Sequence, residues 1–178
     1  MRYRLLETKA LLGWEDLSPH AGQCILVEGG RIAAVGPRGE LSALVGGEPC
    51  QRIDLSHLYL LPGLINTHVH LEFSGDTNPL ADYYAESPEK RLVRAVRNAQ
   101  VMLHSGVTTV RDCGSSWTAL ALADSGLWAL AGTPRLLMCG PPLTVTAGHL
   151  HWMHGEVDTA EEMVRQVRLL KKRGAASI

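Results

Sequence analysis

The sequence predicts an α/β protein in which a small β domain is followed by the first three to four strand–helix units of a barrel-like parallel sheet. Two observations support this class. Short apolar segments separated by glycine run up to about residue 61, and strand-like segments then alternate with amphipathic helical segments. The pattern changes at Pro62 and Gly63, which gives a predicted boundary between domains at 1–61 and 62–178.

The first domain is expected to consist of strands joined by tight turns. Its strand-like segments are an opening run through residue 12 and the stretches 24–28, 31–36 and 52–55. Only Gly29 and Gly30 separate the second of these segments from the third. Because glycine accepts positive φ without a Cβ clash, the pair predicts a two-residue hairpin.

The second domain is expected to alternate strands and helices. A strand at 64–70 is followed by a helix that Ser87 caps, that has Pro88 in its first position and that ends near Gly106. The later segments are a strand at 107–111, a helix at about 117–125, a strand at 135–138, a helix capped by Asp158 and the beginning of a strand at 175–178.

The length of the second domain limits what it can build. Parallel strand–helix units usually close into a barrel of eight strands over about 250 residues. Residues 63–178 provide room for three units and the beginning of a fourth. The sequence therefore suggests an N-terminal fragment of such a barrel, a chain that pairs with another polypeptide, or a chain that folds differently from a closed barrel.

Charge, cysteines and hydropathy narrow the class of protein. The 17 basic and 18 acidic side chains nearly cancel, so nucleic acid and anionic membrane surfaces are not expected partners. The four cysteines are far apart and form no C-x-x-C pair, which favours reduced thiols in a cytoplasmic protein. No apolar run approaches the roughly 20 residues that a membrane span needs. These features favour a soluble globular protein that takes small neutral or weakly charged ligands.

The strongest candidate site is the apolar segment LPGLINTHVH at residues 61–70, which ends in His68 and His70. Residues i and i+2 of a strand face the same way, so both imidazoles can reach one metal ion. Neutral imidazole is a good ligand for zinc and similar divalent ions. The alternative is a pair of histidines on a solvated strand face. The carboxyl end of a first barrel strand is where barrel active sites lie, so the segment predicts a metal site at these two histidines.

Three segments resemble motifs of the amidohydrolase superfamily. Residues 61–71 are similar to its opening P-G-x-[IV]-[DN]-x-H-x-H, and the stretch SGVTTVRD at 105–112 resembles its second-strand motif. The stretch GPPLTVTAGH at 140–149 is similar to the third-strand motif of the imidazolonepropionase-like and prolidase-like (Xaa-Pro dipeptidase-like) branch. The resemblance implies a composite β domain, part of a small β-sandwich built in the family from both chain ends, beside a metal-bearing (β/α)8 barrel.

The resemblance also implies a site of which this sequence holds only a part. In the family, two first-strand histidines bind the more buried metal, a fourth-strand lysine bridges two ions, two later histidines add ligands and an aspartate acts as base. His68 and His70 match the first-strand histidines. The ending KRGAASI at 172–178 resembles the family's GAD-x-I-K stretch and stops one residue before the expected lysine. Three or four ligands are therefore expected to lie outside this sequence.

The leading hypothesis is a metal-dependent hydrolase that cleaves a C–N bond of a small amide or dipeptide with metal-activated water, present here as its N-terminal fragment. The expected cofactor is a divalent metal, zinc before others, with one or two ions in the complete fold. Two alternatives stay open: a non-catalytic remnant, and one half of a split enzyme that needs a complementing C-terminal half. A partial barrel would also expose apolar strand faces, which invites homo-oligomers.

Other polar residues near the predicted barrel rim receive separate interpretations. His149 resembles the histidine of a Gly-His motif in the prolidase-like branch and is a candidate substrate-binding residue, the alternative being a solvated loop histidine. Asp112 is interpreted as half of a structural ion pair with Arg111, and Glu72 as a solvated loop acid. No residue of the sequence is assigned a catalytic role.

Overall fold

The structure is a computed structural model that describes residues 1–13 and 18–178. The chain divides into two compact units, Met1–Pro62 and Gly63–Ile178. Each unit has its own sheet and its own hydrophobic core. Among the described residues, no helix is both long enough and apolar enough to cross a membrane.

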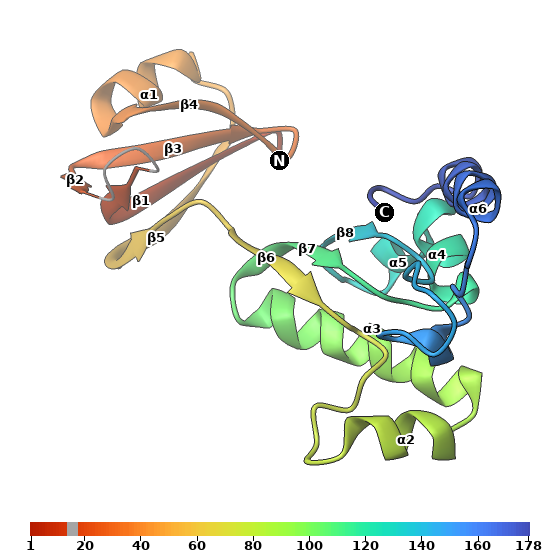
Figure 1. Ribbon diagram of the computed structural model, residues 1–178. Coiled ribbons are helices and arrows are strands. Elements are labelled where there is room, and N and C mark those ends of the chain that lie inside the picture. Colours follow the sequence, from red (N-terminus) through yellow and green to blue (C-terminus); the bar gives the residue numbers. More distant parts are fainter. Residues whose placement is uncertain (14–17) are drawn as a thin grey trace. The chain divides into compact units, whose positions relative to one another are not determined.

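The first unit is one five-stranded sheet with a short helix (Figure 1). Its elements are β1 (Tyr3–Leu12), β2 (Pro19–Ala21), β3 (Gln23–Glu28), β4 (Arg31–Pro37), α1 (Arg38–Leu44) and β5 (Cys50–Leu60). Strand β1 is central, because it pairs antiparallel with β2 and β3 and parallel with β5. Leu5, Leu26 and Leu41 are buried with Cys24 and Val45 in a small core. Strand β2 and helix α1 were not expected from the sequence.

The turn between β3 and β4 is the predicted hairpin. Gly29 and Gly30 have φ angles of +56° and +81°, and Glu28 pairs with Arg31 across them. Both positions need left-handed backbone, which glycine adopts without steric cost. The hairpin prediction is confirmed.

The second unit is a parallel three-stranded sheet with helices packed against it (Figure 1). Its elements are β6 (Leu64–Val69), α2 (Pro79–Ala85), α3 (Pro88–His104), β7 (Val107–Asp112), α4 (Trp117–Asp124), α5 (Leu127–Leu130), β8 (Arg135–Met138), the 3-10 helix η1 (His151–Met153) and α6 (Ala160–Lys172). The strands lie in the order β6-β7-β8 and both pairings are parallel. Consecutive parallel strands joined by helices are the arrangement of α/β proteins, so the predicted α/β class is confirmed.

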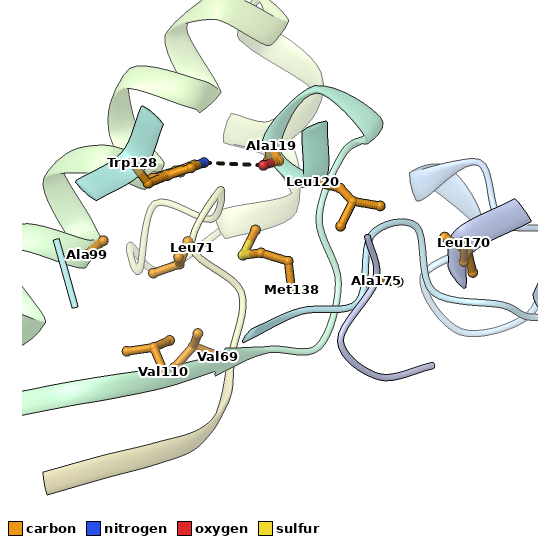
Figure 2. Packing of buried hydrophobic residues seen from close by; sticks show 11 residues of the cluster. Val69, Leu71, Ala99, Val110, Ala119, Leu120, Trp128, Met138, Leu170 and Ala175 are labelled. Carbon is orange, nitrogen blue, oxygen red and sulfur yellow. Dashed lines mark hydrogen bonds between the residues drawn. The ribbon is translucent and has the colours of Figure 1, made fainter. Parts of the chain in front are cut away.

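One hydrophobic core holds the second unit together, and Figure 2 shows its packing. Val69, Val110 and Met138 supply it from the three strands, each no more than 7% exposed. The helices and the chain end add Ala99, Ala119, Leu120, Trp128, Leu170 and Ala175. The indole N–H of Trp128 donates to the Ala119 carbonyl oxygen at 3.2 Å, so burial leaves that polar group satisfied. Alternate strand residues must then face away from this core, where functional side chains can lie.

Two predictions near the end of the chain were wrong. Helix α6 is capped by Thr159, which forms a reciprocal capping box with Glu162, and not by Asp158. The Asp158 carboxylate instead accepts a hydrogen bond from the backbone N–H of Thr146 at 2.8 Å. Residues 175–178 form no strand. One backbone hydrogen bond, from the Ala176 N–H to the Met138 carbonyl oxygen at 2.8 Å, connects this segment to β8.

Candidate functional site

The carboxyl end of β6 brings His68 and His70 together. Val69 between them is buried in the helix-facing core, so strand alternation turns both histidines toward the opposite face. Their ring centroids lie 5.4 Å apart with an angle of 78° between the planes. The pairing of β6 with β7 is irregular between Asn66 and Val69, and such irregularities re-aim side chains near functional sites. The two imidazoles are therefore neighbours at the strand end.

The imidazole of His70 is held in one orientation. Its Nδ1 lies 3.4 Å from the carbonyl oxygen of Gly114. Because a carbonyl oxygen can only accept, Nδ1 carries the hydrogen in this bond and Nε2 keeps a free lone pair. The ring also stacks on Phe73, with centroids 5.1 Å apart. A backbone carbonyl on one ring nitrogen is the usual way in which a protein orients a metal-binding histidine.

Burial keeps His70 in the form that a metal needs. Desolvation lowers the pKa of His70 below its ordinary value, and the charges of His68 and His149 lower it further. The hydrogen bond to Gly114 acts in the opposite direction but is weaker than the burial effect. Neutral imidazole is the metal-binding form, so at neutral pH this side chain is ready to act as a ligand.

Asp112, at the end of β7, fixes the backbone around His70. Its Oδ2 accepts from the N–H of Leu71 at 2.8 Å, and its Oδ1 accepts from the N–H of Gly114 at 3.0 Å. The side chain is fully buried, and this burial raises its pKa to about 7 against the lowering effect of the two N–H groups. The expected ion pair with Arg111 was wrong, because the Arg111 Nε–H donates instead to the Ser177 hydroxyl at 3.2 Å.

Glu72 is a second buried acid behind the strand end. It is 1% exposed, and its Oε2 accepts a hydrogen bond from the backbone N–H of Ser116 at 2.5 Å. The prediction of a solvated loop acid was therefore wrong. The bond connects the segment after β6 to Ser116, the N-cap of α4. Glu72 and Asp112 therefore both hold the backbone that follows β6.

The segment between β8 and α6 carries His149. This side chain is exposed, yet its charge reaches His70, whose pKa it lowers. The segment is anchored by Leu150 and Met153, which are buried in a small cluster with Tyr83. The structure thus places His149 on an anchored loop within electrostatic range of His70.

The described ranges 1–13 and 18–178 contain no group of three or more His, Cys, Asp and Glu side chains arranged to hold a metal ion. His68 and His70 offer two nitrogen donors, and the imidazole of His70 is half-buried, neutral and oriented. These features fit part of a metal site, and a metal would need further ligands to complete its coordination.

Sequence reasoning named both of these acids but missed their role in holding the backbone near His70. Each lies just after a predicted strand, Glu72 two residues after His70 and Asp112 next to Arg111. The N–H groups of Leu71 and Ser116 that these acids accept from lie 41 and 44 residues away from them, so no pattern near either acid could have found this role.

Comparisons with known proteins identify relatives of both units. A model described as "Amidohydrolase family" matches residues 59–176. A model described as "Imidazolonepropionase-like composite domain, bacteria" matches residues 24–44. The first match covers β6 to α6 and therefore includes both histidines of the candidate site.

Two curated proteins match parts of the chain. An imidazolonepropionase from Salinispora tropica is 38% identical over 71 residues, which make up 40% of this chain and 17% of that protein. A 5-methylthioadenosine/S-adenosylhomocysteine deaminase from Symbiobacterium thermophilum is 29% identical over 133 residues, covering 66% of this chain and 30% of that protein. The matched parts are well under half of each relative.

Solved structures match almost all of the chain. A Xaa-Pro dipeptidase with bound methionine has a TM-score of 0.79 at 23% identity, covering 97% of this chain and 45% of that one. A crystal structure of an amidohydrolase has a TM-score of 0.79 at 26% identity, covering 99% of this chain and 46% of that one. The chain therefore spans less than half the length of the proteins whose fold it shares.

Proposed function

This chain belongs to the amidohydrolase family, and on that premise we propose that it carries the first part of a divalent-metal site that hydrolyses a C–N bond in a small amide or dipeptide. The observation that carries the proposal is the pair His68 and His70, whose rings lie 5.4 Å apart at the end of β6. Two neighbouring imidazoles at the carboxyl end of a barrel strand are placed where barrel enzymes bind their substrates.

Zinc is the ion that these donors favour. Imidazole nitrogen is a donor of intermediate softness, which suits zinc better than it suits magnesium or calcium. A divalent ion in this position supplies a Lewis acid and a water of lowered pKa. Nε2 of His70 is the donor for it, because Gly114 occupies the other ring nitrogen at 3.4 Å.

The surrounding residues have positioning roles in this proposal. Asp112 holds the N–H groups of Leu71 and Gly114, the two backbone positions next to His70 and to its carbonyl partner. His149, exposed on the loop after β8, can donate a hydrogen bond to a polar atom of the substrate. Its electrostatic effect on His70 supports a location near the reacting bond.

Turnover needs more groups than this chain supplies. A catalytic zinc site normally has three protein ligands and a water, and general-base catalysis needs an acceptor within about 3 Å of the proton that moves. The described residues offer no third ligand in place. We therefore propose that the remaining ligands and the base come from further strands, either on the same polypeptide or on a complementing C-terminal half. A remnant without activity is the alternative that this shortage favours.

The test compares hydrolysis by the 178-residue chain with hydrolysis by the product of the same reading frame followed beyond Ile178. Both proteins receive zinc and a panel of dipeptides and cyclic amides. We expect metal-dependent turnover by the longer product, lost in His70→Ala and retained in His104→Ala, an exposed histidine at the end of α3. Turnover that appears only with a second polypeptide supports the split enzyme. Turnover that survives His68→Ala/His70→Ala contradicts the proposed site.

A further inference from the structure

Two cysteines directly follow the neighbouring strands β7 and β8. Asp112 pairs with Met138 in the parallel register, and the next residues along the strands are Cys113 and Cys139. The ladder continues past them, since the Cys139 N–H donates to the Asp112 carbonyl oxygen and the Ser115 N–H donates to the Gly140 carbonyl oxygen, both at 3.1 Å. Neighbouring strands lie about 4.8 Å apart, a separation within the range that a covalent link between two cysteines spans.

Both cysteines open onto one cavity at the carboxyl ends of β7 and β8, which the core residue Leu170 borders on one side. There they line a cavity of about 180 Å³ together with Arg111, Pro141, Pro142, Leu143, Leu170 and Ile178. A cavity of about 150 Å³ with apolar walls is large enough to take a benzene ring.

The two thiols differ in exposure, and neither is used by a disulfide. Both cysteines are free; Cys113 is half-buried and Cys139 is buried. Burial, with the neighbouring charges of Asp112 and Cys113, raises the pKa of the Cys139 thiol to about 12. The effect of Cys113 on the pKa of Cys139 agrees with the register in placing the two residues close together, although the Cys113 thiol donates to the Thr67 carbonyl oxygen at 3.7 Å and the Cys139 thiol to the Gly140 carbonyl oxygen at 3.2 Å.

We propose that Cys113 and Cys139 form a dithiol site for a neutral, thiophilic, trivalent metalloid centre, of which a monosubstituted organoarsenical is the model. Two thiols that share one cavity can bind such a centre together, whereas a single thiol binds it weakly and reversibly. The guanidinium of Arg111 lines the same cavity and disfavours a dication such as zinc by charge repulsion. The site is thus distinct in chemistry from the histidine pair on β6, and it does not depend on the proposed function.

The binding step balances without an oxidant. Phenylarsine oxide, C6H5AsO, reacts with two thiols to form two As–S bonds, and the As–O bond breaks. Both thiol protons leave on that oxygen as one water molecule, and arsenic keeps its oxidation state. The half-buried Cys113 reacts first, and Cys139 then closes the ring inside the cavity.

The experiment treats the native wild-type chain with phenylarsine oxide, alkylates the remaining thiols and maps them by mass spectrometry. We expect one adduct per chain, joint protection of Cys113 and Cys139, and release by ethanedithiol. Cys24 and Cys50 serve as internal controls, because they lie in the other unit and pair with β1 at Glu7 and Tyr3, too far apart to share one ligand.

Two further arms make the outcome decisive. Cys113→Ser should lose the adduct completely, and near-ultraviolet circular dichroism checks that this variant remains folded. Zinc should not change the protection of Cys113 and Cys139 in the wild-type chain. The variant His68→Ala/His70→Ala should show the same protection as the wild type. Independent alkylation of the two thiols after arsenical treatment, or an adduct of equal strength in folded Cys113→Ser, overturns the proposal.

Discussion

The carboxylate of Asp112 accepts a hydrogen bond from the backbone N–H of Leu71 at 2.8 Å, and this bond joins the end of β7 to the residue that follows His70. The same carboxylate accepts from the N–H of Gly114, whose own carbonyl oxygen receives the His70 Nδ1–H. One buried acid therefore positions both sides of the candidate metal ligand. Without it, two buried N–H groups would lose their only described acceptors.

Asp112→Asn should destabilise the fold and loosen His70. The amide keeps the shape of the carboxyl group but turns a donor toward one of the two N–H groups, which leaves that group unpaired in a buried place. We expect a loss of about 1 to 3 kcal/mol in the free energy of unfolding. Urea unfolding measures it, with Asp76→Asn at an exposed loop position as the control. Equal midpoints for the two variants would show that the bonds of Asp112 contribute little.

Stability should depend on pH through the same residue. Burial raises the pKa of Asp112 from its ordinary 3.8 to about 7. Between those values the unfolded chain has released the proton and the folded chain keeps it, so the folded state binds more protons and stability falls as pH rises. The contribution is complete below about pH 4 and is lost as pH rises through about 7.

The measurement is the difference in unfolding free energy between the wild type and Asp112→Asn at several pH values between about 4 and 8. The lowered pKa of His70 has the opposite sign of effect, but it is common to both proteins and largely cancels in the difference. We expect the advantage of the wild type to shrink as pH increases. An advantage that does not change with pH, or that grows, contradicts the raised pKa.

Gly114→Ala should weaken metal binding without removing any ligand. A Cβ at this position would lie 2.9 Å from Nδ1 of His70 and 3.0 Å from its Cε1, so the ring must move. Loss of an orienting partner typically costs 10-fold to 100-fold in metal affinity, and we expect roughly that loss of zinc affinity here. Gly39→Ala in α1 is the matched control, because a Cβ there meets nothing within 4 Å. Equal affinities for both variants would mean that His70 does not bind zinc.

Local signals were sufficient to predict the strands and most helices of the second unit. Strand β8 (Arg135–Met138) and helix α3, which is capped by Ser87, lie where they were expected. Both predictions depend on signals from residues close together in the sequence, namely apolar periodicity and a capping residue. The cap of α6 was ambiguous, since Asp158 with Glu161 and Thr159 with Glu162 both fit the same spacing. The Asp158 carboxylate accepts hydrogen bonds from Thr146, twelve residues earlier in the chain, so Thr159 and not Asp158 caps α6.

Only the histidine pair of the candidate site could be predicted from the sequence. The pair His68 and His70 is visible in the sequence because neighbouring same-face strand positions are two residues apart. The supporting bonds of Asp112 and Glu72 reach partners 41 and 44 residues away, and no local pattern encodes such distances. A carboxylate whose partners are distant backbone N–H groups looks, in sequence, the same as a solvated one.

The central claim is that His68 and His70 together bind a divalent metal. Zinc titration by calorimetry of the wild type, His68→Ala/His70→Ala and His57→Ala/His104→Ala tests it most directly, because the last variant removes two exposed histidines elsewhere in the chain. We predict one weak site per chain in the wild type and in the control variant, and its loss in His68→Ala/His70→Ala. Equal zinc binding by all three proteins would contradict the assignment of the metal site to β6.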